Sequence, residues 1–170
     1  MDPFFGWLEA TALSTWIRET QSILGFQAIV VLHTLGMGLL AGTSAAIDLR
    51  ILGAARRIPL PAMEGFFPVF WTGLAINVFS GVLLLIAYPT KAMTNPLFYL
   101  KLTLIGLAVW AVLAIRARVL RGPLGGEVDQ PARAKFLAAL SLALWVGAIT
   151  AGRLLAYTHT RLLVDVKAHF

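Results

Sequence analysis

Four long apolar segments constrain the fold of this chain more than any other feature of its sequence. They cover residues 22–47, 68–88, 97–115 and 136–157. Each provides about 20 predominantly apolar residues, the length that an α-helix needs to cross the hydrocarbon core of a bilayer. The sequence therefore predicts an all-α fold: an integral membrane four-helix transmembrane bundle, formed by a single domain over residues 1–170.

Composition supports the same class. Hydrophobic residues make up 59% of the chain and charged residues 13%, whereas about a quarter of the residues in a soluble domain are charged. The absence of cysteine excludes disulfides, thiolate nucleophiles and Cys-ligated metal clusters. The sequence also lacks a phosphate-binding loop, a dinucleotide fingerprint and the common hydrolase motifs. Catalysis of the kind found in soluble enzymes is therefore not expected.

The first 20 residues predict an amphipathic helix that precedes the first span. They lack the basic start of a signal peptide, and Asp2 and Glu9 break that pattern further. Trp7 and Trp16 suit the membrane interface. We expect the first span to act as its own uncleaved insertion signal.

Lys and Arg positions predict the orientation of the bundle, because cytoplasmic loops carry an excess of these residues. The first and third connections hold eight of them: Arg50, Arg56, Arg57, Arg116, Arg118, Arg121, Arg133 and Lys135. The opposite side holds five: Arg18, Lys91, Lys101, Arg161 and Lys167. Both termini are therefore expected on the periplasmic side of a bacterial inner membrane. This topology and anionic lipid explain the net charge of +6, and no nucleic-acid partner is predicted.

His33 is the most informative polar residue, because ionisable side chains at membrane depth are rare and mark functional sites. Counted from Ser22, it lies roughly 16 Å along the first helix, close to the midplane. Three interpretations remain open. His33 is a structural clasp whose ring nitrogens bond Asn77, a hydroxyl or a backbone carbonyl, the axial ligand of a b-type haem held against Gly36 and its small neighbours, or a copper ligand together with Met37 at i+4.

A six-coordinate haem would need a second ligand, and the only other histidines are His159 and His169. Both follow the fourth span, so His33 and His159 are expected to differ in depth by more than about 12 Å. A single haem does not easily bridge that distance. The remaining options are a five-coordinate haem, a Met ligand, a shifted first helix, or a ligand from a second copy or a partner subunit.

Three further charged residues lie in or beside the spans. Arg153 either snorkels to the nearby headgroups or faces the bundle, where Glu19, Gln27, a haem propionate or an anionic substrate would pair with it. Tyr157, about one helical turn beyond Arg153, marks the expected level of the membrane interface. Asp48 and Arg50 end the first helix, and a local ion pair between them is expected.

Small residues predict close helix packing. Gly38 and Gly42 form one small-xxx-small pair. In the last span, Gly147 pairs with Ala151 and Ala148 with Gly152. We expect these pairs to pack helices within one protomer rather than at a dimer interface.

Three motifs resemble a family of small bacterial four-helix membrane proteins that carry a domain of unknown function. The stretches LHTLGMGLLAGTSAAIDLRILG, TNPLFYLKLTLI and LSLALWVGAITAGRLLAY resemble its first helix, its turn into the third helix and its last helix. The matching residues are His33, Gly36, Asp48, Arg50, Gly53, Asn95, Pro96, Lys101, Gly152, Arg153 and Tyr157. The first helix is also remotely similar to His-bearing helices of copper-resistance D proteins and of small haem-binding membrane proteins.

The resemblance implies fold and topology more than activity. Many members of the family carry another histidine late in the third helix, whereas this chain reads GLAVWAVLAIRAR there. A second ligand at that place would therefore be missing.

Together these observations predict a redox-linked membrane subunit, most simply a b-type haem electron-transfer protein centred on His33. The alternative is a cofactor-free accessory or scaffold subunit of a larger membrane complex. A metal or small-solute permease is least favoured, because inverted repeats and broken helices are absent. The expected partners are the lipid bilayer and either other membrane subunits or a second copy of the chain.

Overall fold

The computed structural model describes residues 3–20, 25–122 and 130–167, without the side chains of residues 3, 5 and 159–167. All the regular structure in these ranges is helical, and four helices are long and apolar enough to cross a membrane. The predicted all-α fold with four spans is thereby confirmed.

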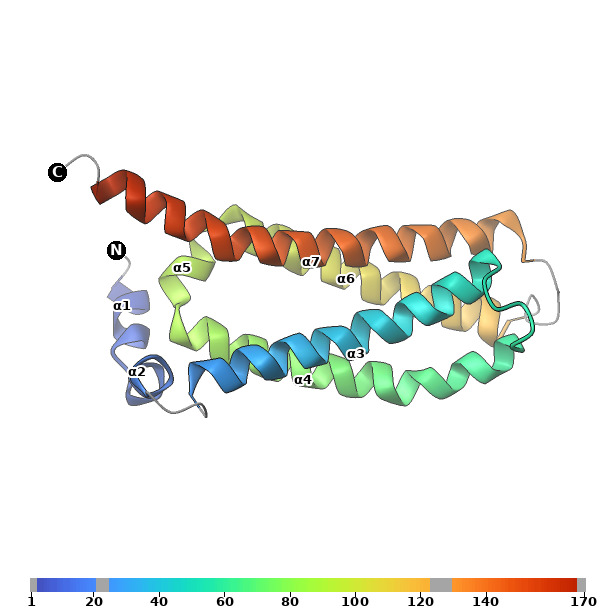
Figure 1. Cartoon of the computed structure of the whole chain (residues 1–170), viewed down its shortest axis with the longest axis horizontal. Helices are drawn as coiled ribbons and strands as arrows, with labels where there is room; N and C mark the ends of the chain where they lie inside the picture. The colour runs from blue at the N-terminus through green and yellow to red at the C-terminus, as the bar shows by residue number, and fades with distance from the viewer. Residues whose placement is uncertain (1–2, 21–24, 123–129, 168–170) are drawn as a thin grey trace.

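The helices follow one another along the chain with short connections (Figure 1). The spans are α3 (Phe26–Leu52), α4 (Phe67–Ala87), α6 (Pro96–Ile115) and α7 (Ala132–Lys167). The 3-10 turn η1 (Leu60–Phe66) leads into α4, and the π-helical turn η2 (Arg116–Leu120) continues α6. Three short helices remain, α1 (Pro3–Glu9), α2 (Ala12–Glu19) and α5 (Pro89–Met93).

Proline, asparagine and glycine set several of these boundaries. Pro96 begins α6, where its missing N–H costs nothing, and the Asn95 side chain accepts a hydrogen bond from the Leu97 N–H at 3.0 Å. At the other end of α3, Gly53 adopts a φ of 108°, which favours glycine, and stops the helix.

Two predicted boundaries were wrong. The first span was placed at 22–47, but the described helix begins at Phe26 and continues to Leu52; residues 21–24 lie outside the described part. The polar segment from 116 to 135 was expected to be a loop. Instead α6 continues through η2, and α7 has already begun at Ala132. Charged residues at membrane ends thus extend the helices beyond their apolar cores.

The bundle consists of two hairpins. Helices α3 and α4 pack along each other, α6 and α7 do the same, and α3 meets α7 between the hairpins. Both chain termini lie at one end, here called the terminal end, and η1 and η2 lie at the other, here called the loop end (Figure 1). At the terminal end, α1 and α2 pack on α4 and α5, where Ser14 and Arg18 donate to the Ala87 carbonyl at 3.5 and 3.3 Å.

Helices α3 and α4 cross at Gly36 and Gly73. A methyl group added at Gly36 would lie 2.9 Å from the Asn77 nitrogen, and one at Gly73 would lie 2.8 Å from the Leu40 nitrogen. The two backbones therefore approach as closely as only glycine permits. The predicted pair Gly38 and Gly42 does not pack here, because nothing lies within 4 Å of a methyl group built on either.

The main hydrophobic core lies toward the loop end. It includes Ile47 and Ile51 of α3, Phe70 of α4, and Val112 and Ile115 of α6. A smaller cluster of Ile17, Ile29 and Ala87 lies at the terminal end. No residue from 96 to 107, the first half of α6, is fully buried. The hairpins are therefore joined by a continuous core only in their loop-end half.

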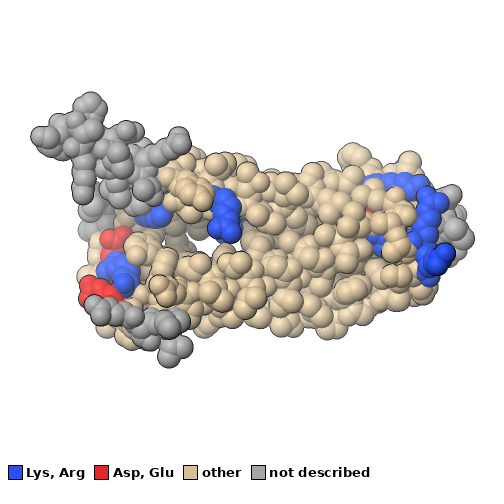
Figure 2. Space-filling view, viewed as in Figure 1, with Lys and Arg blue, Asp and Glu red and all other residues tan. Residues whose placement is uncertain are grey.

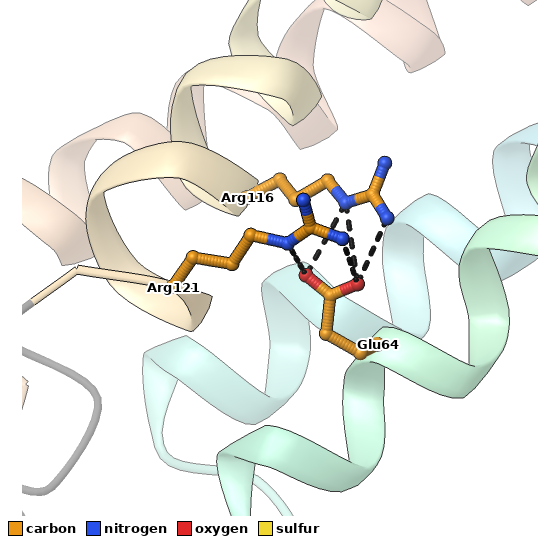
Figure 3. A network of polar contacts seen from close by, with 3 residues as sticks. All are labelled: Glu64, Arg116 and Arg121. Carbon is orange, nitrogen blue, oxygen red and sulfur yellow. Dashed lines mark hydrogen bonds and ion pairs between the residues drawn. The ribbon is translucent and has the colours of Figure 1, made fainter.

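A three-residue ion network fastens the loop end (Figure 3). Glu64 of η1 accepts hydrogen bonds from Arg116 at 2.9 Å and from Arg121 at 2.9 Å. In η2 the Arg121 N–H bonds to the Arg116 carbonyl, five residues earlier, at 3.0 Å. This π-type turn brings both arginines to one side of the helix. Arg116 also lies 4.1 Å from the centre of the Phe67 ring, so the network links both hairpins.

The outer surface of the bundle is largely apolar. Between 22% and 33% of each span is buried inside the bundle, and the broad middle of the molecule shows almost no charge (Figure 2). Tyr88, Tyr99 and Tyr157 are exposed at the terminal end, as expected where a span leaves the hydrocarbon. This surface suits contact with a lipid bilayer.

Candidate functional site

His33 lies on α3 against α4. Its Nδ1 is 3.0 Å from the Ser80 hydroxyl, and a methyl group built at Gly81 would lie 3.4 Å from its Cε1 atom. The Asn77 amide donates to the His33 backbone carbonyl at 3.0 Å. Of the three partners that the structural interpretation allowed for the imidazole, Asn77, a hydroxyl or a backbone carbonyl, the structure has the hydroxyl of Ser80. Asn77 bonds the backbone of His33 rather than its ring.

The second partner of the ring is Lys101 of α6. Its Nζ atom lies 3.4 Å from Nε2 of His33, so the contact joins the two hairpins. The Lys101 side chain runs over Gly152 of α7, where an added methyl group would come within 3.6 Å of it. The residues of the site are thus His33, Ser80 and Lys101, with two glycines beside them.

The hydrogen bonds of this cluster can all be assigned a donor and an acceptor in one consistent order. A lysine ammonium only donates, so Nε2 of His33 accepts from Lys101. The proton of the ring is then on Nδ1, which donates to Ser80, and the Ser80 hydroxyl donates to the Ile76 carbonyl at 2.6 Å. A continuous chain of hydrogen bonds therefore runs from the lysine of one hairpin to the backbone of the other.

His33 lies nearer the end of its helix than the sequence predicted. Because α3 begins at Phe26, His33 is about 10 Å from the end of its helix, and not 16 Å. Lys101 is two residues beyond Tyr99, or about 3 Å along α6. The space-filling view shows the surface hollowed between the two hairpins in this half of the molecule (Figure 2).

Lys101 carries a charge without a countercharge. Among the residues that the structure describes, no carboxylate lies within ion-pair distance of it. Lys101 and His33 are both only partly exposed. A partly buried cation of this kind favours an approaching anion or oxygen acceptor.

Gly36 and Met37 both pack inside the bundle. Gly36 is fully enclosed by the crossing with α4. Met37 packs against the main hydrophobic core. In the described part of the chain, no three His, Cys, Asp or Glu side chains form a group that could hold a metal ion. The proposed metal role of His33 therefore has no further ligands of these types among those residues.

Arg153 and Tyr157 point outward. Both are exposed, and Arg153 has no hydrogen bond to Glu19 or Gln27 in the described structure. This placement agrees with an arginine that snorkels to the headgroups. The backbone of residue 159 continues α7, but the side chain of His159 lies outside the described residues, as does all of His169.

Asp48 and Arg50 do not form the expected ion pair. Residues two apart on a helix do not face each other. Asp48 is fully buried and accepts from Ser44 at 3.3 Å. The Arg50 guanidinium instead donates to the carbonyls of Ile58 at 2.6 Å and Arg56 at 3.1 Å, which folds the connection after α3 back onto the helix end.

A buried polar cluster surrounds Asp48 between α3 and α7. The Trp145 indole donates to the Ser44 hydroxyl at 2.9 Å, and Ser44 lies 3.3 Å from the Ser141 hydroxyl. The Oδ1 atom of Asp48 has no partner. Sequence patterns did not indicate this cluster, because Ser44 and Ser141 are ordinary small residues of membrane helices.

Lys101, like Ser80, is a site residue that the sequence interpretation missed. It was assigned to the outer side as a topological charge, although it lies inside the apolar stretch LFYLKLTLIGLAV. A charge within a span is the same signal that singled out His33. Applied to Lys101, that signal would have made it a second candidate site residue.

Comparison with known proteins adds no relative: no family model, curated protein or solved structure matches this chain.

Proposed function

We propose that the protein is a redox-linked membrane subunit that binds a quinone headgroup between its two hairpins. The observation that carries the proposal is the contact of Lys101 with His33 at 3.4 Å across the hairpins, without a carboxylate partner among the described residues. A ligand at this place meets a cation with two N–H groups still available, because one of the three is directed to His33.

The position of the site favours an amphiphile. Lys101 follows the exposed Tyr99 by two residues on α6, and exposed tyrosines are typical of the level at which a headgroup meets the hydrocarbon. Helix surfaces beside this site are apolar and would accompany a hydrocarbon tail. The absence of side chains at Gly81 and Gly152 lets the imidazole and the lysine lie close to the backbones of α4 and α7.

The chemistry of the site favours a quinone among amphiphiles. The Lys101 ammonium donates to a carbonyl oxygen, and its charge stabilises the negative charge that reduction places on that oxygen. The hydrogen-bond chain through His33 and Ser80 holds the lysine in the gap between the hairpins. The proposal thus concerns binding and electrostatic tuning by this chain.

Quinone binding is tested with Lys101→Met, which keeps the length of the side chain and removes its charge. Binding of decylubiquinone to the purified protein in detergent is followed by quenching of tryptophan fluorescence. We expect Lys101→Met to weaken binding at least about tenfold, the loss typical of one charge-assisted hydrogen bond. Arg153→Met removes a nearby exposed cation and serves as the matched control, with binding unchanged.

Oleate supplies the discriminating ligand, since a carboxylate also pairs with a lysine. Binding of oleate alone, lost in Lys101→Met, would mean an anionic-lipid site and would contradict the quinone proposal. Equal quinone binding by the wild type and Lys101→Met would contradict the site itself.

Haem b stays a separate prediction from the sequence. Both ring nitrogens of His33 have partners here, at 3.0 and 3.4 Å, so axial ligation would require Lys101 or Ser80 to move away. A reduced-minus-oxidised visible spectrum of protein made with haem available decides the question. An absorption band of a b haem that is lost in His33→Ala would establish the ligand; a featureless spectrum from folded protein would remove haem from the mechanism.

An accessory or scaffold role is the second candidate, and one observation favours it. The Gly38 and Gly42 face of α3 is open and exposed, with Leu35 59% exposed beside it. Co-purification of another subunit at fixed stoichiometry, lost when Gly38 is changed to Ile, would support this role. The placement of both termini in the periplasm of a bacterial inner membrane remains a prediction from the charge distribution.

A further inference from the structure

A shallow pocket of about 400 Å³ opens at the loop end between η2 and the start of α7. Arg118 contributes from η2, and Arg133, Phe136 and Leu137 contribute from the first turns of α7. Arg118, Arg133 and Phe136 are exposed, Phe136 by 67%. Two cations and an aromatic ring therefore share one opening on the surface.

The two arginines have no partner in the described structure. Arg116 and Arg121 of the same turn bind Glu64, whereas Arg118 and Arg133 have neither a hydrogen bond nor an ion pair to any described residue. Two arginines without a partner in the described structure therefore line the pocket. Guanidinium groups match the oxygens of a phosphate. The positive N-terminal end of α7 lies beside them.

The order of charged and apolar lining residues along α7 matches the order of headgroup and acyl chains in a phospholipid. Arg133 is the second residue of α7, and Phe136 and Leu137 follow about one turn deeper along the helix. The charged groups therefore lie at the level of headgroups and the apolar side chains at the level of acyl chains. On the face that Figure 2 shows, Lys and Arg side chains gather at the loop end, beyond the largely uncharged middle of the molecule.

We propose that this pocket binds one anionic phospholipid, with its phosphate on Arg118 and Arg133 and an acyl chain along Phe136 and Leu137. The charge distribution predicts that the loop end faces the cytoplasm, where anionic headgroups attract basic residues near the membrane. Such a lipid would sit against the end of each helix of the second hairpin. It is independent of the quinone site at the opposite end.

The experiment compares lipid retention by native mass spectrometry and by thermal stabilisation in mixed micelles. The wild type, Arg118→Gln/Arg133→Gln and the matched control Arg57→Gln/Lys135→Gln are each offered phosphatidylglycerol or phosphatidylcholine. The control also removes two charges from the loop end, but from residues that do not line the pocket. We expect the pocket variant to lose at least about tenfold in apparent phosphatidylglycerol affinity, and the control to change less than about twofold.

Phe136→Ala is the second variant, and it tests the acyl contact. Weakened retention of phosphatidylglycerol with unchanged binding of glycerol phosphate supports a lipid in the pocket. Equal losses in the pocket and control variants would show general electrostatic attraction and overturn the proposal. So would a wild type without preference for phosphatidylglycerol over phosphatidylcholine.

The chain itself offers one rival anion source, because Glu127 and Asp129 lie in the connection between Arg118 and Arg133. The variant Glu127→Gln/Asp129→Asn separates the two cases. Phosphatidylglycerol retention that appears only in this variant would mean that the carboxylates of the chain occupy the arginines, and would overturn the lipid proposal. Retention that is the same in this variant and the wild type supports it.

Discussion

Ser44 is the central residue of the buried polar cluster between α3 and α7. Its hydroxyl accepts from the Trp145 indole at 2.9 Å and lies 3.3 Å from both Asp48 and Ser141. Every member of this group is at most 2% exposed. In such surroundings a polar group that loses its partner keeps its desolvation cost, so one hydroxyl supports three neighbours.

We therefore expect Ser44→Ala to lower the free energy of unfolding by about 1–3 kcal/mol, the cost of a buried donor without a partner. The change leaves the indole N–H of Trp145 without its acceptor. Thr34→Val is the control on the same helix, because the Thr34 hydroxyl is exposed and bonds only to the Val30 carbonyl. Unfolding in detergent, followed by circular dichroism, gives both values; equal stabilities would show that water replaces the lost bond.

The identities of the site residues were partly predictable. His33 was found from sequence because a single ionisable residue stands out in an apolar segment. Its partners were not found, since they lie on α4 and α6 and their spacing along the chain carries no sign of contact. Asp48 shows the same limit. Its burial depends on α7 covering it, which no local pattern reveals.

At the level of elements, glycines determine how α3 meets α4. The structure uses Gly36 and Gly73, at which added methyl groups would lie 2.9 and 2.8 Å from backbone nitrogens of the facing helix. Gly38 lies on the same helix as Gly36, with nothing within 4 Å of an added methyl group. Only the facing helix distinguishes the two positions.

The same substitution at Gly36 and at Gly38 should have different effects on stability. Gly36→Ala must push α3 and α4 apart, and we expect it to destabilise the protein by about 1–3 kcal/mol, the cost of overpacking. Gly38→Ala should be neutral or stabilising by up to about 1 kcal/mol, because alanine favours the helix. Thermal unfolding of the two variants beside the wild type measures the difference. A destabilising Gly38→Ala would indicate that a second chain packs on this face.

The elements themselves were predictable, and their ends and contacts less so. Apolar length alone gave the four spans. The π-helical η2 was missed, because the polar residues, glycines and prolines of the segment from 116 to 135 indicated a loop. Glu64, the partner of Arg116, is 52 residues away in sequence. The predicted packing role of Gly38 and Gly42 failed for a related reason: a small residue permits a close approach, but the partner helix decides where it occurs.

In the molecule as a whole, the two hairpins contact each other more extensively at the loop end than at the terminal end. At the loop end they share the main core and the Glu64 network. In the terminal half the described contacts between α3 and α6 include the bond between His33 and Lys101. The quinone of the proposed function would therefore reach Lys101 through the less enclosed terminal half.

Removing the charge of Glu64 should weaken the contact between the two hairpins at the loop end. Glu64→Gln keeps the shape of the side chain but removes its charge, and we expect a loss of about 1 kcal/mol in stability that disappears at high salt, because such pairs are partly exposed and screened. Arg57→Gln is the control, since it removes a charge from the same end without touching Glu64.

The chain has no cysteine, so spin labels at Val69→Cys on α4 and Leu113→Cys on α6 report the separation of the hairpins directly. Both positions are exposed, by 39% and 38%. In the wild type and in Arg57→Gln we expect a narrow distance distribution between the labels. In Glu64→Gln the distribution should broaden at low salt, and added salt should broaden the wild type toward the same width. Identical distributions in all three proteins would mean that the apolar core alone holds the loop end, and that the ion network contributes nothing to the positions of the hairpins.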